Sequence, residues 1–192
     1  QTTSAENLNQ TRKKHKLPKD FIICVGTIEE RKNGLQILKA LVNCNINIPI
    51  VFVGRPTKYK ELLLDEISKN DQLKNQVIFI ENASNGELKE LYQLAQLSVY
   101  PSIFEGFGIP VLESIAAGTP VITNKAGCFK EAGGEAAFYI DPNNSEEFGS
   151  AIKLLTENTE ALNRLKLAAT HHLENFKEAE LAAQLMSIYK GA

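Results

Sequence analysis

The chain has 192 residues, 43% hydrophobic and 23% charged, a composition that suits one well-packed domain rather than a disordered segment. Its formal net charge of −2 gives no general attraction to nucleic acid, which is therefore not expected as a partner. No apolar stretch reaches the roughly 18 residues of a membrane span. Three cysteines without paired spacing support neither a disulfide framework nor a zinc site, and a reduced, cytoplasmic compartment is expected.

Residues 1–20 are polar and carry the basic run Arg12-Lys-Lys-His-Lys16 ahead of Leu17 and Pro18. A block of like charges is usually a solvated segment, and a patch for a membrane surface is the less favoured alternative. We therefore interpret residues 1–20 as a linker and residues 21–192 as the domain.

Six short runs of β-branched and aromatic residues alternate with segments that have the helical spacing of leucine, isoleucine and alanine. The predicted strands are Phe21–Gly26, Ile48–Gly54, Gln76–Glu81, Ser98–Ser102, Pro120–Thr123 and Ala137–Asp141. The first two are almost wholly apolar, as is typical of parallel strands buried on both faces. The sequence predicts an α/β fold with a Rossmann-like, doubly wound parallel sheet of about six strands and flanking helices.

Two helix starts carry capping signals. Ser84 precedes Glu87 by three residues, a capping-box pattern, and Asn144 precedes two glutamates that suit a first helical turn. From residue 144 to residue 189 the spacing is helical, so C-terminal helices are expected. Their apolar stripes are Ile152, Leu154, Leu155, Leu162 and Leu165, then Leu181, Leu185 and Ile188.

Glu105 and Glu113 enclose seven residues that include two glycines and a proline. Pro110 fits the first turn of a helix, where no N–H is needed, and Gly106 and Gly108 let the backbone approach a ligand closely. The free amides at such a helix start favour phosphate. The motif therefore predicts a small anion-binding loop with a carboxylate at each end.

The two carboxylates should bind something other than phosphate, because like charges repel. Sugar hydroxyls donate hydrogen bonds and suit a carboxylate. Arg31 and Lys32, which follow the first predicted strand, are the candidates to supply positive charge to a diphosphate. The alternative interpretation is that these two residues belong to an ordinary charged loop without a ligand. Ligands of open parallel sheets bind beyond the carboxyl ends of the strands, where the loops after the first four predicted strands can meet.

The segment Pro101-Ser-Ile-Phe-Glu-Gly-Phe-Gly-Ile-Pro-Val-Leu-Glu-Ser-Ile-Ala-Ala-Gly-Thr-Pro-Val121 resembles the E-x7-E signature of the group 1 (family 4) glycosyltransferases, which are retaining enzymes of GT-B architecture. Further matches, in the order that the family uses, are Val25-Gly-Thr-Ile-Glu-Glu-Arg-Lys-Asn33, Glu131-Ala-Gly-Gly-Glu-Ala-Ala137 and Asp141-Pro142. The first of these is most similar to mannosyltransferase-like members, without fixing the donor.

The resemblance implies the C-terminal, donor-binding domain of a two-domain enzyme. That enzyme would transfer a hexosyl group, with mannose as a candidate, from a nucleoside diphosphate sugar to a sugar or lipid-linked acceptor with retention. The N-terminal, acceptor-binding domain would lie outside this chain, so the chain alone is expected to be inactive. The resemblance implies polysaccharide biosynthesis, peripheral contact of the whole enzyme with the inner membrane face, and no cofactor or metal; the chain has no Asp-x-Asp motif.

By the same resemblance, Glu113 would accept hydrogen bonds from both ribose hydroxyls. Glu105 would be the catalytic residue, beside the transferred sugar and its leaving phosphate. The nucleobase would lie near Ala83, with its identity open. Further donor-binding positions are Gly106, Phe107, Gly108 and Ile109.

Lys32 would contact the diphosphate. The family commonly carries an arginine directly after the glycine that ends the first strand, where this chain has Thr27, and we assign Arg31 as its substitute. Phe107 either packs over the donor or anchors its loop in the core.

Two other functions are compatible with the same fold, because a fold does not determine an activity. One is a nucleotide-sugar-binding module without turnover, and the other is a GT-B-like sugar-nucleotide epimerase or phosphorylase. The presence of Glu105, Glu113 and Lys32 favours the transferase. His171 and His172 lie in a predicted helix remote from the signature, so no catalytic histidine is expected.

Overall fold

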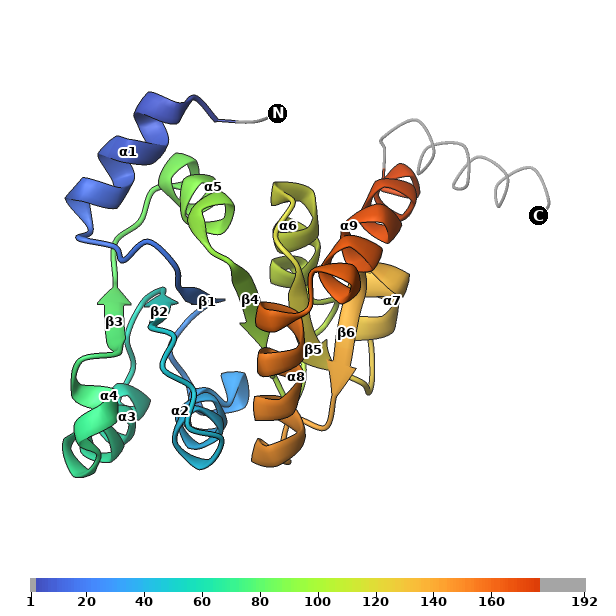
Figure 1. The fold of residues 1–192 in the computed structure, drawn as a ribbon. Coiled ribbons are helices and arrows are strands. Elements are labelled where there is room, and N and C mark those ends of the chain that lie inside the picture. The colour runs from blue at the N-terminus through green and yellow to red at the C-terminus, as the bar shows by residue number, and fades with distance from the viewer. Residues whose placement is uncertain (1–2, 177–192) are drawn as a thin grey trace.

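Six parallel strands form the centre of the computed structural model, which describes residues 3–176 (Figure 1). The strands are β1 (Ile22–Val25), β2 (Ile50–Val53), β3 (Val77–Ile80), β4 (Leu97–Tyr100), β5 (Val121–Asn124) and β6 (Ala137–Ile140). Each coincides with a predicted strand. All neighbouring strands pair in parallel, which confirms the predicted α/β fold.

The strand order is β3-β2-β1-β4-β5-β6. The chain winds from β1 outward to β3 and then from β4 outward to β6 in the opposite direction. As a result β1 pairs on both sides, and Ile22 stands opposite Ile50 of β2 and Leu97 of β4. Doubly wound sheets bind ligands at such a switch point, beyond the carboxyl ends of the strands. The loops after β1 and β4 lie at that edge.

Helices cover both faces of the sheet (Figure 1). The α-helices of the described residues are α1 (Ala5–Lys14), α2 (Gly34–Asn43), α3 (Tyr59–Lys69), α4 (Asp71–Lys74), α5 (Asn85–Leu94), α6 (Ile109–Ala117), α7 (Phe129–Gly133), α8 (Ser145–Glu157) and α9 (Thr159–Glu174), and the 3-10 helices are η1 (Glu30–Lys32) and η2 (Gly134–Ala136). Helices α2, α3, α4 and α8 cover one face, and α5, α6 and α7 the other. Within residues 3–176, no helix combines the length and the apolar character that a bilayer crossing needs.

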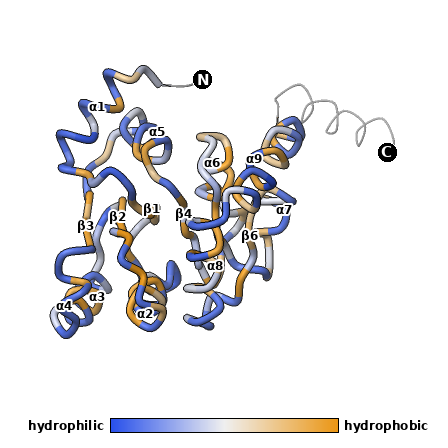
Figure 2. Tube along the Cα trace, in the orientation of Figure 1, coloured by the Kyte–Doolittle hydropathy of each residue, from blue (hydrophilic) through white to orange (hydrophobic). Residues whose placement is uncertain are grey.

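The strand side chains alternate between the two faces. In β1, Ile22 and Cys24 pack in the core with α2 and α8, whereas Ile23 and Val25 pack in the core with α5. The side chains of both cores are buried and apolar, which explains why β1 and β2 are apolar at every position. In Figure 2 the hydrophobic colour follows the central strands accordingly.

Both predicted helix starts are present. The Ser84 hydroxyl accepts a hydrogen bond from the Glu87 amide, and the Glu87 carboxylate accepts one from the Ser84 amide, which completes the capping box of α5. The Asn144 side chain accepts two amide hydrogen bonds from the first turn of α8. Caps of this kind satisfy backbone N–H groups that a helix leaves unpaired at its start.

The predicted C-terminal helical segment is divided by a further cap. Asn158 ends α8, and its side chain accepts a hydrogen bond from the Ala161 amide at the start of α9. The break lets α9 turn toward η2 and α6. The predicted stripe of Leu181, Leu185 and Ile188 lies outside the described residues.

The N-terminal segment differs from the expected solvated linker, because most of it forms α1 and packs on α5. Thr11 donates a hydrogen bond to Glu90, and Lys14 forms an ion pair with Glu87. His15 Nε2 lies 3.2 Å from Glu87 Oε1. These contacts are polar, and α1 is mostly hydrophilic in Figure 2, so its sequence carries no apolar stripe that would predict a packed helix.

Candidate functional site

The loops that follow β1 and β4 are joined at the ligand edge of the sheet. The Ile103 amide donates to the Arg31 carbonyl oxygen at 2.8 Å, and the Ser102 hydroxyl oxygen lies 3.0 Å from the same carbonyl oxygen. Asn124, at the end of β5, donates to the Ser102 carbonyl oxygen at 3.0 Å. Segments that stand 71 residues apart in the sequence therefore form one hydrogen-bonded unit.

Lys32 reaches this unit along the end of β1. Asn33 takes the left-handed conformation, with φ of 58°, and so turns η1 into α2. The Lys32 side chain passes Gly26, where a Cβ would lie 3.3 Å from Lys32 Cε. Gly26 in turn lies against Gly54 at the end of β2. The Lys32 side chain is 11% exposed, and its ammonium lies 4.7 Å from the centroid of the Tyr100 ring.

Four side chains converge on one oxygen of Glu105. Its Oε1 lies 2.5 Å from Lys32 Nζ and 2.5 Å from Arg31 Nη1. The hydroxyls of Ser102 and Tyr100 donate to the same oxygen at 2.7 and 2.9 Å. The structure thus brings the predicted Glu105, Arg31 and Lys32 together in one cluster.

The Glu105 carboxyl is held in its charged form. Burial raises its pKa, but hydrogen bonds from Arg31, Lys32, Ser102 and Tyr100 outweigh burial and leave the pKa at about 2. The pKa of Tyr100 is raised by burial and by its hydrogen bond to Glu105, so this hydroxyl keeps its proton. At neutral pH Glu105 is therefore an anion between two cations and two neutral hydroxyls, and Arg31 forms a second ion pair with Glu29 at 2.8 Å.

The segment from residue 105 to residue 109, here called the signature loop, leads into α6. Gly108 has φ of +97°, which favours glycine, and a Cβ there would lie 3.3 Å from the Phe129 ring. Pro110 lies in the first turn, as predicted. In the described part of the chain, the predicted donor-binding amides donate no hydrogen bond to protein: Gly106, Phe107, Gly108 and Ile109. Unpaired amides at a helix start attract anions.

Glu113 lies in different surroundings. It is half-buried on α6, and burial raises the pKa of its carboxyl. The Tyr92 hydroxyl donates to Glu113 Oε2 at 3.3 Å. Glu113 opens onto a pocket of about 320 Å³ between α5 and α6. The other lining residues are Asn85, Leu88, Lys89, Tyr92, Ala116 and Ala117.

The remaining predicted positions flank these groups. Ala83 is half-buried in the loop between β3 and α5, two residues before Asn85 of the Glu113 pocket. Phe107 packs against the core of α6, α7 and β5, and its ring centroid lies 6.0 Å from that of Phe176 in an edge-on arrangement. Of the two roles considered for Phe107, these contacts favour the anchor.

His172 is closer to the signature loop than the sequence suggested. Its Nε2 lies 2.8 Å from the Ala132 carbonyl oxygen, and its ring is 5.1 Å from that of Phe176, which also contacts Phe107. The sequence did not predict this path of α9, which folds back over η2 and connects His172 to Phe107 through Phe176. Through these contacts the end of α9 braces the signature loop.

Three hydroxyl side chains of the site were not singled out from the sequence. Tyr100 and Ser102 fall at the carboxyl end of the fourth predicted strand, so the rule that ligands bind at that end was an available signal. Tyr92 lies inside α5 with no such signal, because its position beside Glu113 depends on how α5 packs against α6.

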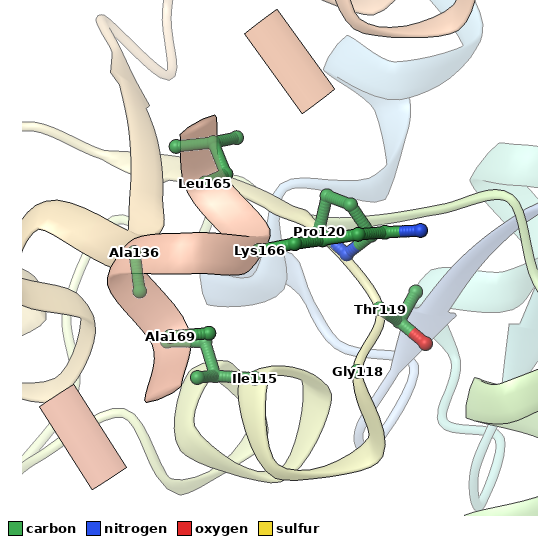
Figure 3. A pocket seen from close by; sticks show the side chains of 8 residues that line it. All are labelled: Ile115, Gly118, Thr119, Pro120, Ala136, Leu165, Lys166 and Ala169. Atoms are coloured by element: carbon green, nitrogen blue, oxygen red, sulfur yellow. The ribbon is translucent and has the colours of Figure 1, made fainter. Parts of the chain in front are cut away.

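Another hollow, of about 140 Å³, lies at the far end of α6 (Figure 3). Ile115, Gly118 and Pro120 form one side, and Leu165 and Ala169 of α9 form the other. Its walls are mostly apolar, and it shares no residue with the signature loop or with the Glu113 pocket. This hollow is separate from the predicted ligand edge.

The doubly wound sheet and its edge site define an α/β domain of the GT-B type. The chain belongs to the family described as glycosyl transferases group 1, whose model matches residues 7–172. The match includes most of α1, both glutamates of the signature and most of α9.

Curated relatives include the O-antigen chain mannosyltransferase RfbU of Salmonella typhimurium, which is 32% identical over 160 residues. The alignment covers 83% of this chain and 45% of RfbU. The D-inositol 3-phosphate glycosyltransferase of Corynebacterium glutamicum is 30% identical over 182 residues, which cover 88% of this chain and 42% of that protein. The chain therefore spans less than half the length of these relatives.

Solved structures share the fold at low sequence identity. The crystal structure of Anabaena Alr3699/HepE in complex with UDP and glucose has a TM-score of 0.85 and 21% identity, covering 100% of this chain and 54% of that one. The C-terminal domain of the group 1 glycosyl transferase LpcC from Francisella tularensis has a TM-score of 0.74 and 24% identity, covering 89% of this chain and 93% of that domain. The described fold thus resembles that of the LpcC C-terminal domain.

Proposed function

We propose that this chain is the donor-binding domain of a retaining hexosyltransferase that uses a nucleoside diphosphate sugar. The observation that carries the proposal is Glu105 held between Arg31 and Lys32, next to the unpaired amides that begin α6. Such a site offers positive charge to a leaving diphosphate and negative charge to the sugar. Membership of the glycosyl transferases group 1 family supports a transfer reaction.

In the proposed complex, the donor lies along the sheet edge from the Glu113 pocket to Glu105. The ribose diol donates to Glu113, whose carboxylate has few protein partners and can accept both hydrogen bonds. The base lies by Ala83. The diphosphate meets Lys32, Arg31 and the start of α6, and the hexose lies beside Glu105.

The proposed chemistry is electrostatic. As the nucleoside diphosphate departs, negative charge grows on the leaving oxygen, and Lys32 and the α6 amides stabilise it. The sugar becomes oxocarbenium-like, and the acceptor arrives on the same face, as retention requires. With a pKa of about 2, Glu105 stays ionised and stabilises positive charge rather than donating a proton.

We propose mannose as the hexose and a second domain, outside this chain, as the acceptor site. Curated relatives with mannosyltransferase names support the sugar, and the HepE complex with UDP and glucose provides the alternative to test. The chain covers less than half of RfbU, which supports a second domain. Under this proposal residues 21–192 are the donor domain, and the whole enzyme builds a polysaccharide on the cytoplasmic side of the membrane.

Calorimetry with GDP, UDP and ADP tests the donor site, with guanosine, uridine and adenosine as controls. We expect one diphosphate to bind about tenfold or more tightly than its nucleoside, because Lys32 and Arg31 act only on the phosphates. Equal affinity for diphosphates and nucleosides would contradict the proposal. Incubating the longer protein with GDP-mannose or UDP-glucose, followed by NMR of the product anomer, then tests transfer and retention.

A further inference from the structure

Tyr100 occupies the centre of the edge site and is fixed by the core. It ends β4, its side chain is almost completely buried, and its ring stands edge-on to Phe129 with 6.1 Å between centroids. The Thr123 hydroxyl donates to the Tyr100 carbonyl oxygen at 2.9 Å. The position of the Tyr100 hydroxyl is therefore set by the packing of the sheet and not by a flexible loop.

This hydroxyl forms a triangle with Lys32 and Glu105. It donates to Glu105 Oε1 at 2.9 Å, and because its only hydrogen is used there, it accepts the hydrogen bond from Lys32 Nζ. Lys32 also contacts Glu105 Oε1 at 2.5 Å and lies over the Tyr100 ring. Each of the three groups therefore contacts the other two.

The contacts of Lys32 respond differently to an approaching diphosphate. Glu105 is an anion and competes with phosphate for the ammonium. Tyr100 is neutral, and both its hydroxyl and its ring can keep their contacts with Lys32 when a phosphate binds. Lysine has a flexible four-carbon stem, so a side chain already held in place loses less rotamer freedom on binding.

We propose that Tyr100 is a positioning residue for the donor diphosphate, whose hydroxyl and ring hold the Lys32 ammonium where the phosphates arrive. The proposal rests on the proposed function, because it concerns the same diphosphate. It adds a residue that contacts neither the sugar nor the phosphates and acts through Lys32.

Tyr100→Phe tests the proposal, because it removes the hydroxyl and keeps the buried ring. We expect its affinity for the preferred nucleoside diphosphate to fall about three- to tenfold, with unchanged affinity for the nucleoside. Tyr139→Phe on β6 is the matched control, since the Tyr139 hydroxyl donates to the Gly134 carbonyl oxygen at 2.7 Å, away from Lys32. The control should alter the melting temperature without altering the ratio of the two affinities.

A double-mutant cycle separates positioning from a general loss of stability. In a Lys32→Ala background, Tyr100→Phe should cause no further loss of diphosphate affinity, because the group that it positions is already absent. Additive losses would overturn the proposal, since Tyr100 would then act independently of Lys32.

A measurement without ligand gives a second readout. Carboxyl NMR of Glu105 should show a pKa above about 2 in Tyr100→Phe and no change in Tyr139→Phe. If the parent chain prefers diphosphate but Tyr100→Phe matches the control in affinity, the positioning role is wrong whatever the pKa does. If the parent chain has no diphosphate preference, the proposed function fails first and the diphosphate role of Tyr100 fails with it.

Discussion

Glu105 and Glu113 stand at the two ends of one motif, yet their surroundings have opposite effects on their charge. Hydrogen bonds from two cations and two hydroxyls overcome burial at Glu105 and lower its pKa to about 2. At Glu113 burial dominates over the single Tyr92 hydrogen bond and raises the pKa. A glutamate side chain is therefore a stable anion at position 105. At position 113 it is a hydrogen-bond acceptor whose burial is only partly offset by the Tyr92 hydrogen bond.

The difference suits the two roles proposed for these carboxylates. A fixed charge with its partners in place is suited to stabilising charge in a reaction, because nothing has to reorganise. A half-buried carboxylate with few donors gains most from a ligand that brings two hydroxyls. Single substitutions at and around the two carboxylates test this contrast.

The largest effect is expected from Lys32→Ala, which should weaken nucleoside diphosphate binding by about 2–4 kcal/mol and leave nucleoside binding unchanged, because the ammonium acts on phosphate only. Calorimetry with both ligands checks this. Lys60→Ala is a matched control, because Lys60 has the same two kinds of contact as Lys32. Its ammonium lies 2.6 Å from the Glu81 carboxylate and 4.7 Å from the Phe79 ring centroid, but Lys60 is on α3 and not in the cluster around Glu105. Equal losses for diphosphate and nucleoside would make Lys32 a structural residue.

Glu113→Gln should weaken the diphosphate and the nucleoside equally, by about 1–3 kcal/mol, because it spoils a charge-assisted hydrogen bond to the ribose that both ligands share. The domain should stay folded, which a melting curve can verify. Glu131→Gln, an exposed position on α7, is the control. An affinity equal to that of the parent chain would remove the ribose role.

Glu105→Gln should act in the opposite direction on the free diphosphate. Removing the carboxylate frees Lys32 from a competing anion and leaves Arg31 paired with Glu29 alone, so we expect tighter binding by about 1 kcal/mol. Transfer by the longer protein should fall sharply in the same variant. Weaker diphosphate binding would mean that Glu105 holds the two cations in place rather than competing for them.

The smallest effect is expected from pH. The pKa of Glu113 is raised above its ordinary value of 4.5, and ribose binding needs the ionised form, so nucleoside affinity should be complete well above that pKa and fall as the pH drops through it. Glu105, with a pKa of about 2, stays charged over the same interval. Titrations between pH 7 and pH 4 should show a slope in the parent chain and almost none in Glu113→Gln.

The sequence predicted what depends on short-range patterns. The six strands followed from apolar runs, and the starts of α5, α6 and α8 followed from Ser84, Pro110 and Asn144. The clustering of Glu105 with Lys32 was expected only at the level of a shared sheet edge, because these residues are 73 positions apart.

What the sequence did not predict depends on how distant elements pack. The docking of α1 rests on polar contacts of Thr11 and Lys14 that leave no periodic pattern. The approach of His172 to the signature loop follows from the path of α9 after the break at Asn158. The proposed role of Tyr100 in positioning Lys32 depends on the register of β1 and β4. That register determines which side chains of the two following loops come into contact.

The close contact of Gly26 with Gly54 has a consequence for laboratory evolution of donor preference. A Cβ at position 54 would lie 2.1 Å from the Gly26 carbonyl oxygen, and both residues have positive φ angles, so nearly every substitution there is incompatible with the fold. Libraries should leave these strand ends untouched. Asn85 and Lys89 are exposed in the lining of the Glu113 pocket, and under the proposed function they are the positions to vary in a search for a new nucleotide preference.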